Sequence, residues 1–135
     1  MTPIIEAQSR LQTEEGFRAL PYKDTRDHIS IGYGFNVDAG ISKYAAAALL
    51  GAQLTELDTA MQGFTWYKVA NDVRKSVFLD IAFNDGLHGL LNFPHMLAAA
   101  TRGDWEMAAK ECAVTEPELA ARYAVLAQLL LTGVS

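Results

Sequence analysis

Residues 14–36 read EEGFRALPYKDTRDHISIGYGFN, and this stretch decides how the rest of the chain is interpreted. Residues 22–24 and 29–35 have the alternation of short strands, and residues 25–28 have the composition of the turn between them. Five residues of the stretch carry groups or backbone freedom typical of a site: Glu15, Asp24, Ser30, Gly32 and Gly34. The sequence therefore predicts a small β-hairpin with two acids, a hydroxyl and two glycines gathered on it.

Glu15 is expected at the end of a short amphipathic helix. Apolar residues recur at helical spacing near the N-terminus, and Thr2 or Pro3 suits the start of a helix. Gly16 would end it, because glycine relieves the left-handed strain of a helix terminus. The helix macrodipole does not favour negative charge at that end, so helix stability does not explain why an acid stands at residue 15. Arg18 is the nearest candidate to neutralise it.

Gly32 and Gly34 are expected on the same face of the second strand as Ser30. Glycines two residues apart leave that face bare, so that another backbone or a ligand can come close. A nucleotide-binding loop is the alternative, but Val37 stands where a third glycine would belong and no helix follows directly. We therefore predict a bare shelf and not a phosphate site.

Composition and charge narrow the choice of partners. The 135 residues fit one domain, and the balance of 50% hydrophobic and 20% charged residues is that of an ordinary globular protein. The formal net charge is −5 and no lysine or arginine cluster appears, which argues against nucleic acid and anionic membranes. Binding to a partner that is itself acidic would need local positive charge on this protein and should weaken as salt falls.

Other classes of site and targeting segment find little support. Cys112 is the only cysteine, so no intramolecular disulfide can form. The three histidines show no metal-ligand spacing with one another or with Cys112, and no cofactor is predicted. The N-terminus lacks the pattern of a secretory signal, and no apolar run approaches the ~20 residues of a membrane span. We expect a monomer made in the cytoplasm, and its release would depend on a separate membrane-permeabilising protein.

The remainder of the chain reads as helices. Longer helices are predicted over residues 43–61 and 72–85 and from residue 117 to about 131, with short ones opening near residues 94 and 104. Serine and asparagine suit the N-caps of the first two, and residues 115–118 (TEPE) fit a capping box for the last. Residues 63–67 are predicted to break the helices. Three aromatic residues in this region are more typical of core than of sugar stacking: Trp66, Phe83 and Trp105.

The hairpin stretch resembles the signature of phage-type lysozymes, glycoside hydrolase family 24, the family of the T-even phage endolysin. That family has Glu-Gly near the N-terminus, a Tyr-x-Asp step and then Thr-Ile-Gly-x-Gly. The matching residues here are Glu15-Gly16, Tyr22-Lys23-Asp24 and Ser30-Ile31-Gly32-Tyr33-Gly34. The likeness continues through AFN at residues 82–84 to TG at residues 132–133 and so covers nearly the whole chain. Departures include serine for threonine at residue 30, aspartate for glycine at residue 27 and phenylalanine for histidine at residue 35.

The resemblance implies an α+β fold, mostly helical, in which a small β-hairpin lobe packs on a helical body with a cleft between them. It implies a single domain over residues 1–135, with a β-rich lobe at about 15–40 and a helical lobe at about 42–135 that includes the N-terminal helix. The implied substrate is the glycan strand of peptidoglycan. The implied reaction is hydrolysis of the β-1,4 bond between N-acetylmuramic acid and N-acetylglucosamine for lysis of the bacterial wall.

Such a reaction needs a proton for the leaving oxygen and a second carboxylate that stabilises the transition state or fixes the attacking water. The resemblance implies inversion, with Glu15 as the acid and with Asp24 and Ser30 jointly positioning the water. Four residues are predicted to contact substrate: Gly32, Asn36, Phe83 and Asn84. The alternative roles are a solvated acid for Glu15, a turn former for Asp24, a strand hydrogen-bonder for Ser30 and a core residue for Phe83.

Two other functions remain open. A non-catalytic wall-binding or phage structural module that kept the lysozyme fold would share the same sequence pattern. A lytic transglycosylase would cleave the same bond without water and leave anhydro ends on the sugar.

Overall fold

The computed structural model describes residues 2–114 and 117–135, and the chain divides into two compact units. The first, called the N-terminal unit here, ends at Ala48, and the second, the helical unit, begins at Leu49. The boundary falls inside the helix α2 (Lys43–Met61). The prediction of a single domain, with the N-terminal helix assigned to the helical lobe, stays a prediction.

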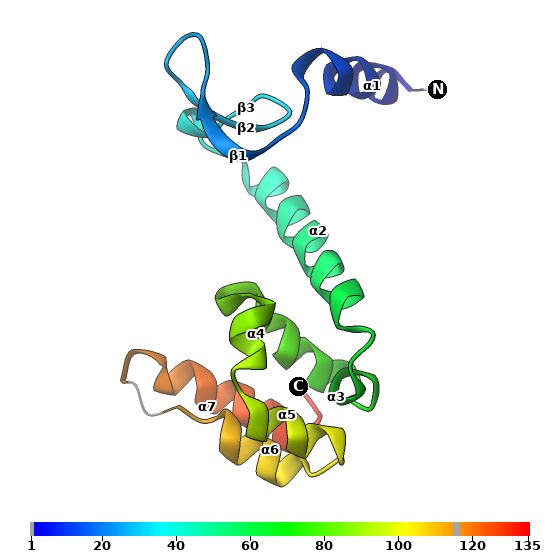
Figure 1. Cartoon of the computed structure of the whole chain (residues 1–135), viewed down its shortest axis with the longest axis vertical. Helices are drawn as coiled ribbons and strands as arrows, with labels where there is room; N and C mark the ends of the chain where they lie inside the picture. The colour runs from blue at the N-terminus through cyan, green and yellow to red at the C-terminus, as the bar shows by residue number, and fades with distance from the viewer. Residues whose placement is uncertain (1, 115–116) are drawn as a thin grey trace. The chain divides into compact units, whose positions relative to one another are not determined.

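The N-terminal unit contains one helix and a three-stranded sheet (Figure 1). The helix α1 (Pro3–Glu15) begins and ends where its local chemistry predicts. The Thr2 hydroxyl accepts a hydrogen bond from the Ile5 backbone N–H at 3.2 Å, and Gly16 ends the helix with φ at 69°. The N–H of Gly16 also reaches the Gln12 carbonyl at 3.2 Å, which closes the last turn.

The sheet is antiparallel in the order β1-β2-β3. Its strands are β1 (Arg18–Lys23), β2 (Ile29–Gly32) and β3 (Phe35–Asn36), and the 3-10 helix η1 (Val37–Ala39) follows. In the middle strand Ser30 stands opposite Tyr22 on one side and opposite Asn36 on the other. This register makes Ser30 the centre of the sheet.

The predicted strand over residues 29–35 is wrong, because the chain turns back after Gly32. Gly32 and Gly34 have φ of 69° and 79°, values that suit glycine and that extended strands do not have. Gly32 therefore ends β2 and Gly34 lies in the turn between β2 and β3, so the alternation of a single strand does not continue through them.

The helical unit holds the rest of α2 and five further helices. These are α3 (Thr65–Lys68), α4 (Asp72–Leu91), α5 (Pro94–Thr101), α6 (Trp105–Cys112) and α7 (Pro117–Thr132). The predicted helix over residues 43–61 is confirmed, as are the predicted N-caps Ser42 and Asn71, whose side-chain oxygens accept hydrogen bonds from backbone N–H groups at 3.1 and 3.0 Å. Asp104 caps α6 in the same way, at 3.1 Å. The predicted capping box of the last helix includes residues 115 and 116, which lie outside the described part of the chain.

Two helix predictions need correction. The helix predicted to end at residue 85 continues to Leu91, although Gly86 interrupts it with φ 76° and ψ 162°. Residues 63–67, predicted as a break, contain the start of α3, which places Trp66 and Tyr67 in the core. A four-residue helix is too short to show a periodic pattern in the sequence.

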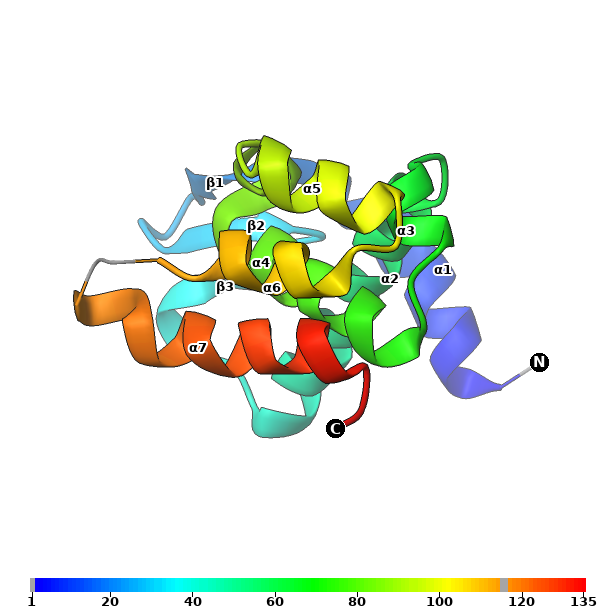
Figure 2. The ribbon, with the colours of Figure 1, turned by 90° about the horizontal axis from the view of Figure 1, so that it is seen from below.

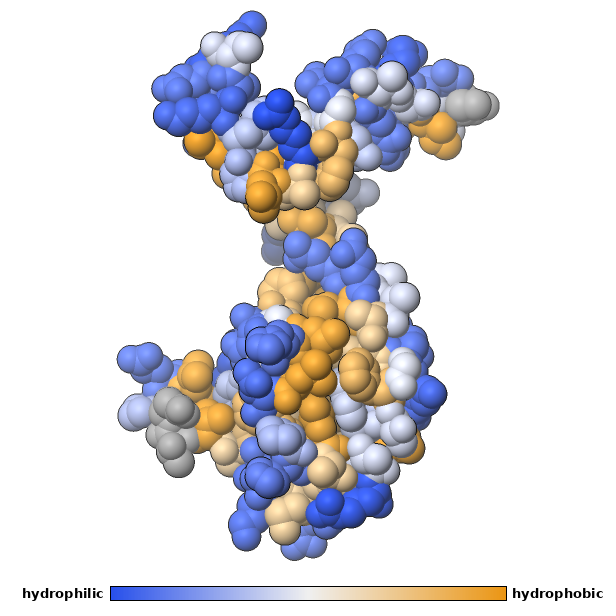
Figure 3. Space-filling model, viewed as in Figure 1, coloured by the Kyte–Doolittle hydropathy of each residue, from blue (hydrophilic) through white to orange (hydrophobic). Residues whose placement is uncertain are grey.

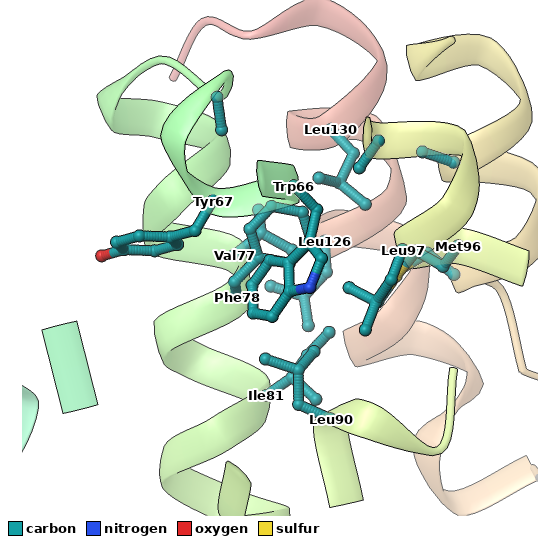
Figure 4. Packing of buried hydrophobic residues seen from close by; sticks show 14 of the residues in the cluster. Trp66, Tyr67, Val77, Phe78, Ile81, Leu90, Met96, Leu97, Leu126 and Leu130 are labelled. Carbon is teal, nitrogen blue, oxygen red and sulfur yellow. The ribbon is translucent and has the colours of Figure 1, made fainter. Parts of the chain in front are cut away.

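The core of the helical unit lies among α3, α4, α5, α6 and α7. Figure 2 shows α6 between α5 and α7, and these two neighbours are the ones it packs against. The Trp66 indole meets the Phe78 ring edge-on with centroids 5.1 Å apart, and both rings are buried (Figure 4). Around them lie apolar residues from three helices, α4, α5 and α7: Val77, Ile81, Leu90, Met96, Leu97, Leu126 and Leu130. No helix of the described residues is long and apolar enough to cross a membrane.

Candidate active site

The carboxylate of Glu15 reaches the turn between β2 and β3. An ideal Cβ placed on Gly34 would stand 2.8 Å from the Oε2 atom of Glu15, inside the closest approach of real Cβ atoms. The acid at the end of α1 therefore occupies the space that the missing side chain leaves. Glu15 itself is exposed, so its carboxylate is open to solvent and to a ligand.

Gly32 is covered in a similar way by a neighbour in its own turn. A Cβ on Gly32 would stand 3.0 Å from Cδ2 of Phe35, the residue at which β3 begins. The predicted bare shelf is therefore corrected, because Phe35 covers one glycine and Glu15 fills the space at the other. The predicted role of Gly32 in substrate binding stays a prediction.

Asp24 organises the turn at the opposite end of β2. Its Oδ1 atom accepts hydrogen bonds from the backbone N–H groups of Arg26 at 2.8 Å and His28 at 2.9 Å. The Asp24 N–H in turn donates to the His28 carbonyl at 2.8 Å, and Asp27 completes the turn with φ at 66°. Aspartate tolerates this left-handed backbone better than most residues, which explains how it replaces a glycine there.

These hydrogen bonds favour the charged form of the carboxylate. The pKa of Asp24 is lowered, first by the backbone N–H of His28, with smaller contributions from the Arg26 N–H and from the charges of His28 and Arg26. Asp24 is thus held as an anion, the state in which a carboxylate orients water or stabilises positive charge.

Ser30 is buried, with 3% of its surface exposed, at the centre of β2. Its strand neighbours across the sheet are Tyr22 and Asn36, so the predicted site residues Ser30 and Asn36 form a cross-strand pair. Glu15, Asp24, Ser30, Gly32 and Asn36 all belong to the N-terminal unit. Arg18, the expected partner of Glu15, instead lies with its guanidinium 4.2 Å from the centre of the Tyr22 ring.

Phe83 and Asn84 belong to the helical unit, on α4. Phe83 is 43% exposed and lines two adjoining grooves of about 500 Å³ and 370 Å³ between α2 and α4. Apolar residues supply much of both walls, and apolar side chains are visible on the surface of this unit (Figure 3). The Asn84 amide donates to the Asp80 carbonyl at 2.9 Å, and the Asp80 carboxylate pairs with Arg122 of α7.

Sequence reasoning missed two residues that hold the hairpin. The Oδ2 atom of Asp38 accepts a hydrogen bond from the Ile29 N–H at 3.0 Å, which ties η1 to the start of β2. His28 contacts Asp24 through both its backbone and its side chain. No sequence spacing identifies the Asp38 contact, since it joins residues nine apart across two turns. His28 and Asp24 are four residues apart within one turn, so the sequence spacing alone could have indicated their contact.

A chain that combines a small antiparallel sheet with a mostly helical unit, and carries one acid at a helix end and a second in a hairpin turn, has the elements of the lysozyme-like cell-wall hydrolases. The phage lysozyme family matches residues 12–118, and the chain belongs to that family. The match includes all seven residues predicted for the site. Members of the family are glycoside hydrolases that degrade peptidoglycan, so this chain is a hydrolase of the endolysin type. No curated protein matches the chain.

Proposed function

We propose that the protein hydrolyses the β-1,4 bond between N-acetylmuramic acid and N-acetylglucosamine, with inversion, and so lyses the bacterial wall. Glu15 gives its proton to the leaving oxygen, and Asp24 and Ser30 hold the attacking water. The observation that carries this proposal is the placement of the two acids. Glu15 stands at the Gly34 turn beyond one end of β2, and Asp24 stands in the turn at the other end.

The length of β2 supports inversion over retention. The four residues of β2 place the two turns roughly 10 Å apart, at about 3.3 Å per step. Inverting glycosidases separate their carboxyl groups by about 6.5–9.5 Å to leave room for water, whereas retaining ones bring them within about 5–5.5 Å. Two acids at opposite ends of a short strand fit the wider spacing.

The two acids also differ in the way the reaction requires. Asp24 is fixed by two backbone N–H groups and has a lowered pKa, which suits the partner that remains ionised. Glu15 accepts no hydrogen bond of this kind within the described residues, and it stands at the C-terminal end of α1, exposed and open to a leaving oxygen. The general acid and the water-holding base are therefore assigned in this order.

Wall digestion with matched variants tests the assignment. Purified peptidoglycan is incubated with the wild type, Glu15→Gln, Asp24→Asn and the control Glu14→Gln, which changes the neighbouring exposed acid. The wild type and the control are expected to clear the suspension. Glu15→Gln and Asp24→Asn are expected to clear it at a rate at least about 100-fold lower. Clearance by Glu15→Gln at the wild-type rate would refute its role as the acid.

The products separate this function from its alternatives. Mass spectrometry of the released fragments is expected to find reducing ends. NMR of the first product is expected to show the inverted anomer. Anhydro ends would identify a lytic transglycosylase. If the wild-type protein sediments with wall material but clears none, the protein is a wall-binding or structural module.

Substrate contacts are proposed at Gly32 and Asn36 of the hairpin and at Phe83 and Asn84 of α4. The exposed Phe83 ring above an apolar groove suits the apolar face of a sugar. Phe83→Ala is expected to raise KM about 10-fold, equivalent to about 1.4 kcal/mol. Leu91→Ala, an exposed residue on the same helix, serves as its control. We further propose that the protein acts as a monomer after synthesis in the cytoplasm and release by a membrane-permeabilising partner.

A further inference from the structure

The two carboxylate oxygens of Asp24 have different surroundings. Oδ1 accepts both backbone hydrogen bonds of the turn, from Arg26 and His28, so its lone pairs are occupied. Oδ2 accepts no hydrogen bond from residues 2–114 or 117–135, and its nearest charged partner is Nδ1 of His28 at 3.7 Å. Oδ2 is therefore the oxygen left to hold a water, and the His28 imidazole stands beside it.

The effect of His28 on Oδ2 depends on the charge of the imidazole. At 3.7 Å a neutral ring makes no hydrogen bond, because N–H···O bonds require about 2.7–3.2 Å. A protonated ring at the same place is attracted to the anion and closes onto it. Both side chains are partly exposed, at 47% for His28 and 32% for Asp24, so the ring has room to move and to exchange protons with solvent.

Four other charged residues lie around this turn, and three of them make contacts of their own. At the end of β1, Lys23 pairs with Asp27 at 3.4 Å, and in η1 the carboxylate of Asp38 binds the Ile29 N–H. Arg26 lies in the turn and acts on Asp24 as a fixed positive charge. Lysine, arginine and aspartate side chains ordinarily keep their charge between about pH 5 and 8, whereas histidine changes its charge in that range.

We propose that His28 is a positioning residue that controls the access of water to Asp24. Protonated, it draws Oδ2 into an ion pair and takes that oxygen away from the attacking water. Neutral, it leaves Oδ2 free and the hydrogen-bonded Oδ1 still fixes the carboxylate. This inference rests on the proposed function, in which Asp24 holds the water.

The proposal has a consequence for the rate as a function of pH. The acid limb of the wild-type profile is expected in the range where histidine side chains in general change charge, between about pH 5 and 8. In His28→Asn the side chain cannot acquire charge, so the limb moves at least one pH unit lower, to where Asp24 itself accepts a proton. In His28→Lys a positive charge is present at every pH tested, so the acid limb disappears and the rate stays low across the range.

The experiment measures initial rates on solubilised peptidoglycan from pH 4 to 9 for the wild type, the two His28 variants and His95→Asn. His95 is an exposed histidine at the start of α5, outside the proposed site, and its variant should keep the wild-type limb. Circular dichroism at each pH restricts the comparison to folded protein. If His28 were merely structural, its substitution would lower the rate at every pH. The proposal instead requires that the substitution move the pH at which the rate falls in acid.

The outcomes are distinct from those that test the proposed function. If His28→Asn keeps the wild-type limb while Asp24→Asn is inactive, His28 does not control Asp24 and the inference is overturned, but the catalytic assignment stands. If Asp24→Asn is as active as the wild type, both are overturned. A limb that shifts downward in His28→Asn and is absent in His28→Lys supports the inference.

Discussion

The Oε2 atom of Glu15 lies 2.8 Å from the point where Gly34 would carry a Cβ, so the carboxylate stands close to the hairpin turn. Two features favour glycine at residue 34, the space that the carboxylate fills and a φ of +79°. Their effects can be separated experimentally, because Gly40 also has a positive φ, +80°, but has nothing within 4 Å of its Cβ position.

Gly34→Ala and Gly40→Ala are both predicted to lose stability, but only Gly34→Ala is predicted to lose activity. Each forces alanine to a positive φ, at a cost of about 1–3 kcal/mol. Only Gly34→Ala displaces Glu15, and a misplacement of this kind lowers kcat roughly 100-fold. Thermal unfolding and peptidoglycan turbidity measure the two effects. Equal activity of the two variants would show that Glu15 does not depend on the turn.

The turn at Asp24 is predicted to loosen in acid. Because the folded-state pKa of Asp24 is lowered, its hydrogen bonds stabilise the turn at pH values above the unfolded-state pKa. This contribution is lost as the pH falls through the lower, folded-state pKa. NMR of the carboxyl group should give a titration midpoint below that of a peptide with the same turn sequence. A midpoint at or above the peptide value contradicts the prediction, and Asp24→Asn should remove the acid response of the Arg26 and His28 amides.

Arg74 is predicted to stabilise the end of α7. Its guanidinium donates to the carbonyls of Leu130 at 2.8 Å and Leu131 at 3.0 Å and lies 4.4 Å from the centre of the Trp105 ring. Arg74→Ala should lower the free energy of unfolding by about 2–3 kcal/mol, since it removes two charged hydrogen bonds and leaves a helix end uncapped. Arg74→Lys should recover less than half of the loss, because an ammonium cannot form the same fork. Full recovery in urea titrations would assign the effect to charge alone.

Phe78 is predicted to dominate the core of the helical unit. It is fully buried against Trp66, so Phe78→Ala should cost about 3–5 kcal/mol. Val69→Ala, at a site 49% exposed, should remain within about 0.5 kcal/mol of the wild type. Urea unfolding followed by tryptophan fluorescence reports both. A loss below about 1 kcal/mol for Phe78→Ala would mean that the core closes around the cavity.

Features set by chemistry within a few residues could be predicted from the sequence. The hydroxyl of Thr2 and the amide of Asn71 sit at the first free N–H groups of their helices, and this preference holds wherever the residues occur. The position of Glu15 at a helix end followed from Gly16 for the same reason. The family signature supplied the α+β fold, which no local rule provides.

Features set by tertiary contacts could not be predicted. Alternation assumes an extended backbone, so it misread Gly34 as a strand residue and did not show that β2 ends at Gly32, where φ is positive. What fills the space beside Gly34 is a side chain nineteen positions earlier, and no pattern in the sequence joins the two. The contact of Asp38 with Ile29 escaped for the same reason, because it depends on where η1 folds back.

The absence of a side chain at residue 34 also limits how this protein can change. Codon 27, where aspartate has φ at 66°, should tolerate asparagine or glycine in a library selected for bacterial lysis. At codon 34 the same selection should recover glycine alone, because any side chain there would displace the Glu15 carboxylate, whatever backbone angles that residue prefers. Residue 34 takes no part in the reaction. It nevertheless constrains the position of the Glu15 carboxylate in every active variant.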